Sequence, residues 1–217
     1  MSEQQNPVEE SRHAELLRLA DSLRAGEPVT DAAFDALLPK RWRWISATHW
    51  TPVEVCRTAA SWLAPGPDSL VLDVGSGVGK LCLVGALSTG ASFVGVEQRP
   101  HLVKVAAALG AELGATSAVF LGADAFSLDW RDFTSLYFFN PFAEAIFPQA
   151  LRIDATVKLS EEQHAALIDR LEGKLLELQP GARVVVYCGL GRRVPEAFAR
   201  TASERLGNNN LELWVRR

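Results

Sequence analysis

Three glycines at alternate positions constrain this chain more than any other feature. Gly75, Gly77 and Gly79 follow a segment that opens with the apolar run Leu70-Val71-Leu72, and a second apolar stretch begins at Leu81. This order predicts a buried strand, a tight turn and a helix, which together begin a βαβ unit. Glycine has no Cβ, so a ligand can lie against the backbone of the turn, where the N–H groups and positive dipole end of the helix face it. The turn is therefore predicted to bind a nucleoside that carries a negative group.

Spacing separates the loops that have this general form. A dinucleotide-binding loop needs a third glycine where this chain has Lys80. A phosphate-binding P-loop needs a glycine at the position of Val74 and a serine or threonine at the position of Leu81. Both of these loop types are excluded at defining positions.

The observed pattern is Asp-x-Gly-x-Gly-x-Gly, with the acid at Asp73. It resembles the glycine loop of the class I S-adenosylmethionine-dependent methyltransferases. The resemblance implies that S-adenosyl-L-methionine is the cofactor. It implies that the loop residues Gly75, Ser76, Gly77 and Gly79 hold the amino-acid end of the cofactor and that Asp73 binds its ammonium. The alternative is a strand–helix turn that binds nothing.

Two more acids follow at the ends of predicted strands. The apolar run 93–96 ends at Glu97, and the run 118–121 leads to Asp124. A carboxylate at a strand tip can accept hydrogen bonds from ribose hydroxyls. By the same resemblance, Glu97 would bind the cofactor ribose and Asp124 the adenine amino group. The alternatives are a solvated acid at Glu97 and a local turn residue at Asp124.

Strands and helices alternate through the middle of the chain. Strands are expected at 70–75, 92–97, 117–121 and 136–142, with helices from 79 and at about 100–113. This alternation predicts an α/β fold with a doubly wound, mostly parallel sheet, in which ligands bind at the carboxyl ends of the strands. We expect a Rossmann-like methyltransferase core at 64–217 behind an N-terminal helical cap at 1–63.

The fourth strand ends in Asn140-Pro141-Phe142. This tripeptide resembles the Asn/Asp-Pro-Pro-aromatic motif of amino-group methyltransferases, although it has one proline and its aromatic residue comes one position early. The resemblance implies that Asn140 holds the N–H of the methyl acceptor and that Phe142 packs against the substrate. A strand that ends in a proline turn, with Phe142 in the core, is the alternative.

The cap contains a segment in which cations alternate with tryptophans, Lys40-Arg41-Trp42-Arg43-Trp44. Such a pattern can bind single-stranded nucleic acid. Because the segment is short and the chain is acidic overall, we favour tryptophans packed inward beneath surface cations; a lid over the substrate pocket is a third possibility. Residues 1–10 are polar and are expected to be disordered, and helices are expected from Ala14 and from Thr30.

The sequence Thr51-Pro52-Val53-Glu54 predicts a helix that starts with a capping box. In many class I methyltransferases a helix in this position crosses the cofactor site, so His49, Trp50 and Thr51 could contribute to the pocket. A plain N-cap at Thr51, with no ligand, is equally consistent with the sequence.

Residues 147–158 are expected to form loop and pocket wall. A second capping box at Ser160 predicts a helix that reaches Leu178. A fifth strand is expected at 183–188, a helix at about 195–206 and a strand at 211–215. The class I fold ends in an antiparallel strand pair, of which the sequence shows one clear member.

Composition limits the partners. The 217 residues carry a formal net charge of −4, which suggests no general affinity for nucleic acid or acidic membranes. The three cysteines lie far apart and predict neither a disulfide framework nor a metal site. We see no secretory leader and no apolar run that could span a bilayer, so a cytoplasmic protein is expected.

The resulting hypothesis is methyl transfer to a nitrogen of a protein or small molecule. The alternatives are O-methylation, nucleic-acid methylation, and a non-catalytic nucleoside-binding protein that retains the cofactor cleft.

Overall fold

The computed structural model describes residues 7–217. Residues 1–10 are expected to be disordered. Of these, residues 1–6 lie outside the described range, and the expectation is wrong for residues 7–10. They form the first turn of helix α1 (Pro7–Arg24), and proline is favoured at a helix start because its φ is already helical and its missing N–H would have no partner there.

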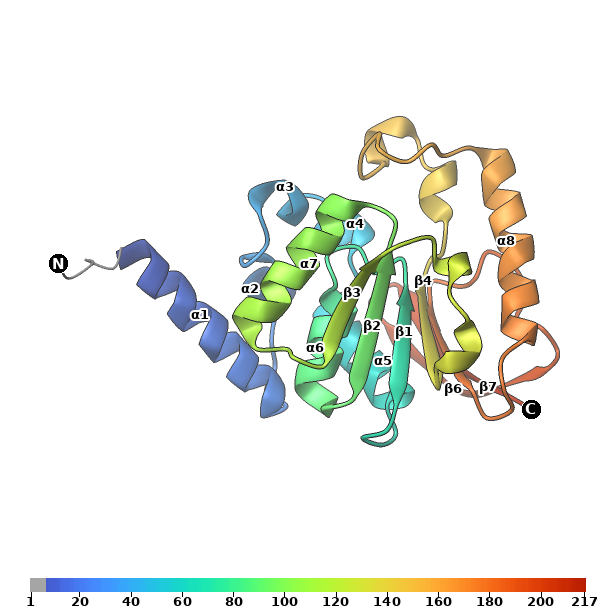
Figure 1. Ribbon diagram of the computed structural model, residues 1–217, viewed down its shortest axis with the longest axis horizontal. Helices are drawn as coiled ribbons and strands as arrows, with labels where there is room; N and C mark the ends of the chain where they lie inside the picture. Colours follow the sequence, from blue (N-terminus) through green and yellow to red (C-terminus); the bar gives the residue numbers. More distant parts are fainter. Residues whose placement is uncertain (1–6) are drawn as a thin grey trace.

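Within these residues the chain forms one sheet of seven strands, in the order β3-β2-β1-β4-β5-β7-β6 (Figure 1). The first five strands are parallel, and β7 runs antiparallel to both of its neighbours. The strands are β1 (Leu70–Val74), β2 (Ser92–Glu97), β3 (Ala118–Gly122), β4 (Ser135–Phe139), β5 (Arg183–Tyr187), β6 (Phe198–Leu206) and β7 (Asn209–Arg216). The order reverses between β1 and β4, which is where ligands bind in such sheets. The predicted doubly wound sheet is confirmed.

Helices cover both faces of the sheet, and the alternation of side chains along β1 shows how. Val71 is buried in the core cluster that includes residues of α5 (Val53–Leu63), α6 (Lys80–Thr89) and α7 (Pro100–Leu113). The next residue, Leu72, is buried in the cluster on the other face, which includes residues of α8 (Glu161–Leu176). Because both faces are covered, the central strands are apolar at nearly every position.

The N-terminal cap is joined to the core through a buried cation. It consists of α1, α2 (Asp31–Asp35), α3 (Lys40–Arg43) and α4 (Ser46–His49). Lys80, at the start of α6, is 2% exposed, and its Nζ lies 2.5 Å from Asp31 Oδ1 and 2.9 Å from Asp35 Oδ1. Asp31 Oδ1 also accepts a hydrogen bond from the Val53 amide at 2.9 Å. One carboxylate of α2 therefore caps α5 and pairs with α6.

This contact corrects the predicted capping box at Thr51. Helix α5 begins at Val53 with Pro52 as its N-cap residue, and no side chain of that residue can cap it. Asp31 takes the capping role from a distant part of the chain. Thr51 Oγ1 instead lies 3.1 Å from the Tyr137 hydroxyl in the buried interior. The predicted caps at Thr30 and Ser160 are confirmed, since their hydroxyls accept from Ala33 N and Gln163 N.

The helix expected at 195–206 is wrong, because residues 198–206 form β6. This strand pairs with β7 through a two-residue turn at Gly207-Asn208, where Gly207 has φ +58°. Gly-Asn between two extended runs is a hairpin signal, and pairing with β7 overrides the helix-compatible composition of 198–206. The C-terminal antiparallel pair is therefore complete.

Short 3₁₀ helices occupy the connections beside the strand ends. They are η1 (Ala125–Ser127), η2 (Trp130–Asp132), η3 (Ala143–Ile146) and η4 (Gln149–Leu151). No helix in residues 7–217 has the length and apolar character needed to cross a membrane.

Candidate active site

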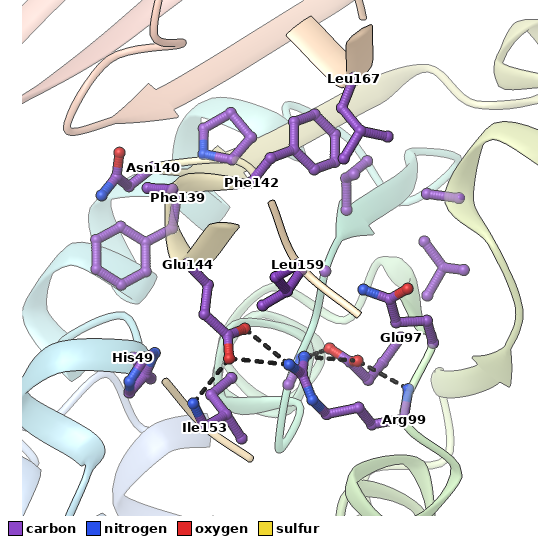
Figure 2. A pocket seen from close by; sticks show the side chains of 18 of the residues that line it. His49, Glu97, Arg99, Phe139, Asn140, Phe142, Glu144, Ile153, Leu159 and Leu167 are labelled. Atoms are coloured by element: carbon purple, nitrogen blue, oxygen red, sulfur yellow. Dashed lines mark hydrogen bonds and ion pairs between the residues drawn. The ribbon is translucent and has the colours of Figure 1, made fainter. Parts of the chain in front are cut away.

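A pocket lies at the carboxyl ends of β1 to β4, with the cap on one side (Figure 2). Every segment predicted to carry the site contributes to its wall. The lining includes Gly75 and Gly77 after β1, Glu97 and Arg99 at β2, Asp124 and Phe126 after β3, Asn140, Phe142 and Glu144 after β4, and His49 and Trp50 from the cap.

The first two glycines of the loop face this pocket and the third does not. The amides of Gly75 and Ser76 donate to the carbonyl oxygen of Val96, which folds the loop over the end of β2. Gly77 has φ +55°, and a Cβ there would lie 2.5 Å from the ring of Trp50. Gly79 has φ +78°, and a Cβ there would lie 2.4 Å from the ring of Phe120. The third glycine is therefore required for packing at the start of α6.

Glu97 joins the tip of β2 to the glycine loop. It is 5% exposed, and its two oxygens accept from the amides of Gly77 at 3.2 Å and Arg99 at 2.9 Å. Burial raises the pKa of Glu97, while the two amides and the Arg99 guanidinium favour its charged form. A carboxylate can accept about four hydrogen bonds, so Glu97 retains capacity for ribose hydroxyls.

Asp73 does not line the main pocket. It lines a small second pocket with Ser76 and Thr51, and this pocket shares Gly75 and Trp50 with the main one. The Cys82 thiol donates to Asp73 Oδ2 at 3.5 Å. Burial raises the pKa of Asp73 to about 7. Because a thiol is a weak donor, this buried carboxylate is a suitable partner for a ligand ammonium.

Asp124 lines the main pocket but is exposed. Its Oδ1 accepts from the Phe126 amide at 3.0 Å, so it caps η1, and the Arg170 guanidinium lies 3.9 Å from Oδ2. The local turn role considered for Asp124 is thus present, and the residue also stands at the pocket edge predicted for adenine.

The Asn140-Pro141-Phe142 turn forms the opposite wall of the pocket from Glu97 and Arg99 (Figure 2). Asn140 has φ +41° and Phe142 φ +62°, a left-handed conformation that is uncommon for phenylalanine. The Phe142 ring stacks on Phe126 with centroids 5.6 Å apart. Strained backbone of this kind concentrates at functional sites. Phe142 both packs against core residues and lines the pocket.

His49 brings the cap into contact with the loop after β4. Its Nε2 lies 2.8 Å from the carbonyl oxygen of Leu151, and burial lowers the pKa of the ring. His49 and Trp50 line the main pocket, whereas Thr51 lines the small one. The pocket wall expected from 147–158 is present, since Phe147 and Ile153 line the cavity.

Sequence reasoning missed the ion cluster around Arg99, which is 3% exposed. Its guanidinium bonds to both oxygens of Glu144 at 2.9 Å and to Asp154 Oδ1 at 3.2 Å, and lies 3.6 Å from Glu97 Oε1 (Figure 2 shows the pairs with Glu97 and Glu144). Arg99 thereby connects the tip of β2 with the loop that follows β4. Glu144 and Asp154 lie 47 and 57 residues after Glu97 in the sequence, so spacing could not have found the cluster.

The chain matches no protein-family model and no curated protein. Its structure is similar to an RNA methyltransferase from Salinibacter ruber in complex with S-adenosyl-L-homocysteine (24% identity, 75% of this chain and 88% of that chain, TM-score 0.53). It is similar to TrmN from Thermus thermophilus (21% identity, 82% of this chain and 52% of that chain, TM-score 0.55). It is also similar to MtNAS in complex with MTA and tNA (13% identity, 94% of this chain and 71% of that chain, TM-score 0.56).

Sequence identities this low show a shared fold and nothing finer. The strand order β3-β2-β1-β4-β5-β7-β6 with an antiparallel β7 agrees with the antiparallel pair expected at the C-terminus. The chain therefore has the fold of the class I S-adenosylmethionine-dependent methyltransferases.

Proposed function

We propose that this protein is an S-adenosylmethionine-dependent methyltransferase that acts on a nitrogen atom. One observation carries the proposal: the glycine loop, Glu97, Asp124 and Asn140, which come from the ends of four strands, line a single pocket. The solved structure of the Salinibacter ruber RNA methyltransferase, which has the same fold, contains S-adenosyl-L-homocysteine.

The residues present suit the parts of this cofactor. Glu97 offers carboxylate lone pairs for ribose hydroxyls, and its contact with Gly77 holds the loop in place. Asp73 lines the small adjoining pocket, where an ammonium bound beside it would favour the charged form of its carboxylate. Ala125 and Phe126, beside Asp124, give an apolar wall for the adenine ring.

S-adenosylmethionine would supply an electrophilic methyl group on a positively charged sulfur. The chain then has to orient the acceptor and exclude water, and such positioning can supply much of the rate enhancement. The side-chain oxygen of Asn140 would accept a hydrogen bond from the N–H of the substrate. This contact would direct the lone pair of that nitrogen toward the methyl group of the cofactor. Its left-handed backbone fixes the direction in which that side chain leaves the turn.

Transfer of a different group is a second possibility because a sulfonium carries three carbon substituents. The similarity to MtNAS in complex with MTA and tNA covers 94% of this chain and includes the cap region. The fold is therefore compatible with transfer of the methyl group or of another carbon substituent of the sulfonium.

Product analysis tests the proposal. The protein is incubated with S-adenosyl-[methyl-³H]methionine and with protein, RNA and small-molecule fractions of the source cell. We expect tritium in one fraction and an equal amount of S-adenosylhomocysteine. Release of 5′-methylthioadenosine would instead show transfer of another group, and cofactor binding without transfer to any fraction would indicate a non-catalytic binding protein.

A further inference from the structure

The segment Lys40–Trp44 differs in structure from the arrangement favoured by sequence. Trp42 packs inward as expected: it is 5% exposed and stacks on His101 with ring centroids 5.3 Å apart. Trp44 does not, because 78% of its surface is exposed, the largest fraction among the exposed large hydrophobic residues of the described chain. Single hydrophobic residues are common on protein surfaces, so the side chains near Trp44 have to show whether it binds a partner.

Three cations precede this exposed ring in the sequence. Lys40, Arg41 and Arg43 are all exposed, and the Arg41 side chain keeps 65% of its surface in solvent. The Arg43 guanidinium also donates to the carbonyl oxygens of Ala36 at 2.7 Å and Leu38 at 3.3 Å. Two acids of neighbouring segments have largely buried side chains and are paired. Asp35 bonds to Lys80, and Asp154, at 7% side-chain exposure, bonds to Arg99. The exposed charge of the segment is therefore positive in a chain whose net charge is −4.

The segment also borders the pocket. Arg41 lies 3.9 Å from Asp154, which is bonded to the pocket residue Arg99 and follows the pocket residue Ile153. Trp50 donates its indole N–H to the carbonyl oxygen of Trp42 at 2.9 Å and lines the pocket itself. Helices α3 and α4 lie together at the strand-end side of the sheet in Figure 1. The segment thus contacts the pocket wall through Trp42, and Trp44 lies two residues further along the chain.

We propose that Lys40, Arg41, Arg43 and Trp44, which we name the entrance patch, bind a single-stranded nucleic acid that presents a base to the pocket. An exposed aromatic ring can stack on a base of any identity, and lysine and arginine side chains bind the adjoining phosphates. An acidic protein segment could also approach these cations, but it would not supply a planar base to stack on the Trp44 ring. The inference deepens the proposed function and rests on it, because it names the class of methyl acceptor.

Fluorescence anisotropy tests the patch directly. The probes are fluorescein-labelled 15-nucleotide single-stranded RNA, single-stranded DNA of the same sequence, and the corresponding DNA duplex. We expect the protein to bind the single strands more tightly than the duplex, with an affinity that falls as salt increases. The RNA and DNA arms determine which sugar the acceptor carries.

Variants separate stacking from charge. Trp44→Ala should weaken single-strand binding about 5- to 100-fold, the range for loss of one stacked base, and Trp44→Phe should restore most of the affinity. Lys40→Ala should reduce the slope of log affinity against log salt by about 0.7, the value for one phosphate contact on a single strand. Leu176→Ala on α8 and Arg205→Ala on β6 are matched exposed controls and should change neither quantity.

Calorimetry with S-adenosylhomocysteine on the same samples keeps the two proposals distinguishable. If the wild-type protein does not bind S-adenosylhomocysteine, the proposed function itself is contradicted. Intact nucleoside binding with no affinity for single strands, or with equal affinity in wild type and Trp44→Ala, would overturn the entrance patch. Tritium transfer to the protein fraction without transfer to nucleic acid would overturn it as well.

Discussion

The Glu97 carboxylate and the Gly77 amide are joined by a hydrogen bond of 3.2 Å, across 20 residues of sequence. The contact ties the tip of β2 to the turn between β1 and α6. Glu97 therefore has a structural role before any ligand arrives, since it fixes the loop whose backbone would face the cofactor. Glu97 also lines the main pocket.

Gly77→Ala should be more damaging than its positive φ alone would predict. A Cβ at this position would lie 2.5 Å from the Trp50 ring, so the ring must move away from the loop. Gly90 is a matched control, because it also has positive φ (+72°) but no atom within 4 Å of a Cβ. Gly90→Ala should lower the free energy of unfolding by about 1–2 kcal/mol. Gly77→Ala should lower it further and weaken S-adenosylhomocysteine binding. Equal effects of the two substitutions in urea unfolding would contradict the role of Trp50.

Asp73 should make stability fall as the pH rises. Its pKa is about 7 in the folded protein against 3.8 for an ordinary aspartate, because burial disfavours the charged form. The folded state therefore holds the proton more tightly, and the free energy of unfolding decreases between about pH 4 and pH 7. The contribution is about 4 kcal/mol at most. Asp73→Asn should flatten this part of the profile, measured by urea unfolding across that range. Profiles that stay parallel would show that Asp73 titrates normally.

Lys80→Met should loosen the cap. The substitution removes the cation between Asp31 and Asp35 and leaves Asp35, whose side chain is 13% exposed, without its partner. Breaking such a buried pair costs about 3 kcal/mol or more. The double variant with Asp35→Leu should recover part of the loss, because it leaves no buried unpaired charge there. Lys104→Met, at an exposed position of α7, is the control. An unfolding free energy equal to that of the control would mean that the cap does not depend on this pair.

Asn140 should matter for turnover and not for cofactor affinity. If its side chain holds the N–H of the methyl acceptor, Asn140→Gly should lower kcat by about 100-fold or more while S-adenosylhomocysteine affinity stays close to wild type. Glycine adopts the same left-handed backbone, so the turn is not strained. Asn140→Asp keeps a side-chain oxygen that can accept the N–H, and it should retain much more of the rate. Kinetics require the acceptor identified by the tritium experiment, and a wild-type rate in the glycine variant would remove Asn140 from the mechanism.

The sequence predicts the part of the site that is local along the chain. The glycine loop, Glu97 and Asn140 each sit at the end of an apolar strand, and parallel strands place such ends together whatever the surrounding loops do. The spacing could not show that Gly79 packs against Phe120, because that contact crosses from α6 to β3. Nor could it show that Asp73 lines the small pocket and not the main one, because Trp50 from the distant cap lines both pockets.

Long-range partners account for the remaining differences. Thr51 has the sequence of a helix cap, but Asp31 reaches the same helix from α2. Residues 198–206 have a composition compatible with helix, but pairing with β7 makes them a strand. Arg99 bonds to or pairs with Glu97 of β2, Glu144 of η3 and Asp154 of the loop after η4, and this set leaves no pattern in the sequence. In each case a contact between distant segments decides the outcome.

Calorimetric titration with S-adenosylhomocysteine tests whether the strand-end pocket binds the S-adenosylmethionine cofactor. We expect one site per chain and no comparable binding of NAD or ATP. Glu97→Ala should weaken the affinity by about 1–3 kcal/mol, the range for hydrogen bonds to a charged group. Glu204→Ala, an exposed acid on β6, should leave the affinity unchanged. Tight binding of NAD with no heat from S-adenosylhomocysteine, or equal affinities in wild type and a folded Glu97→Ala protein, would contradict the account.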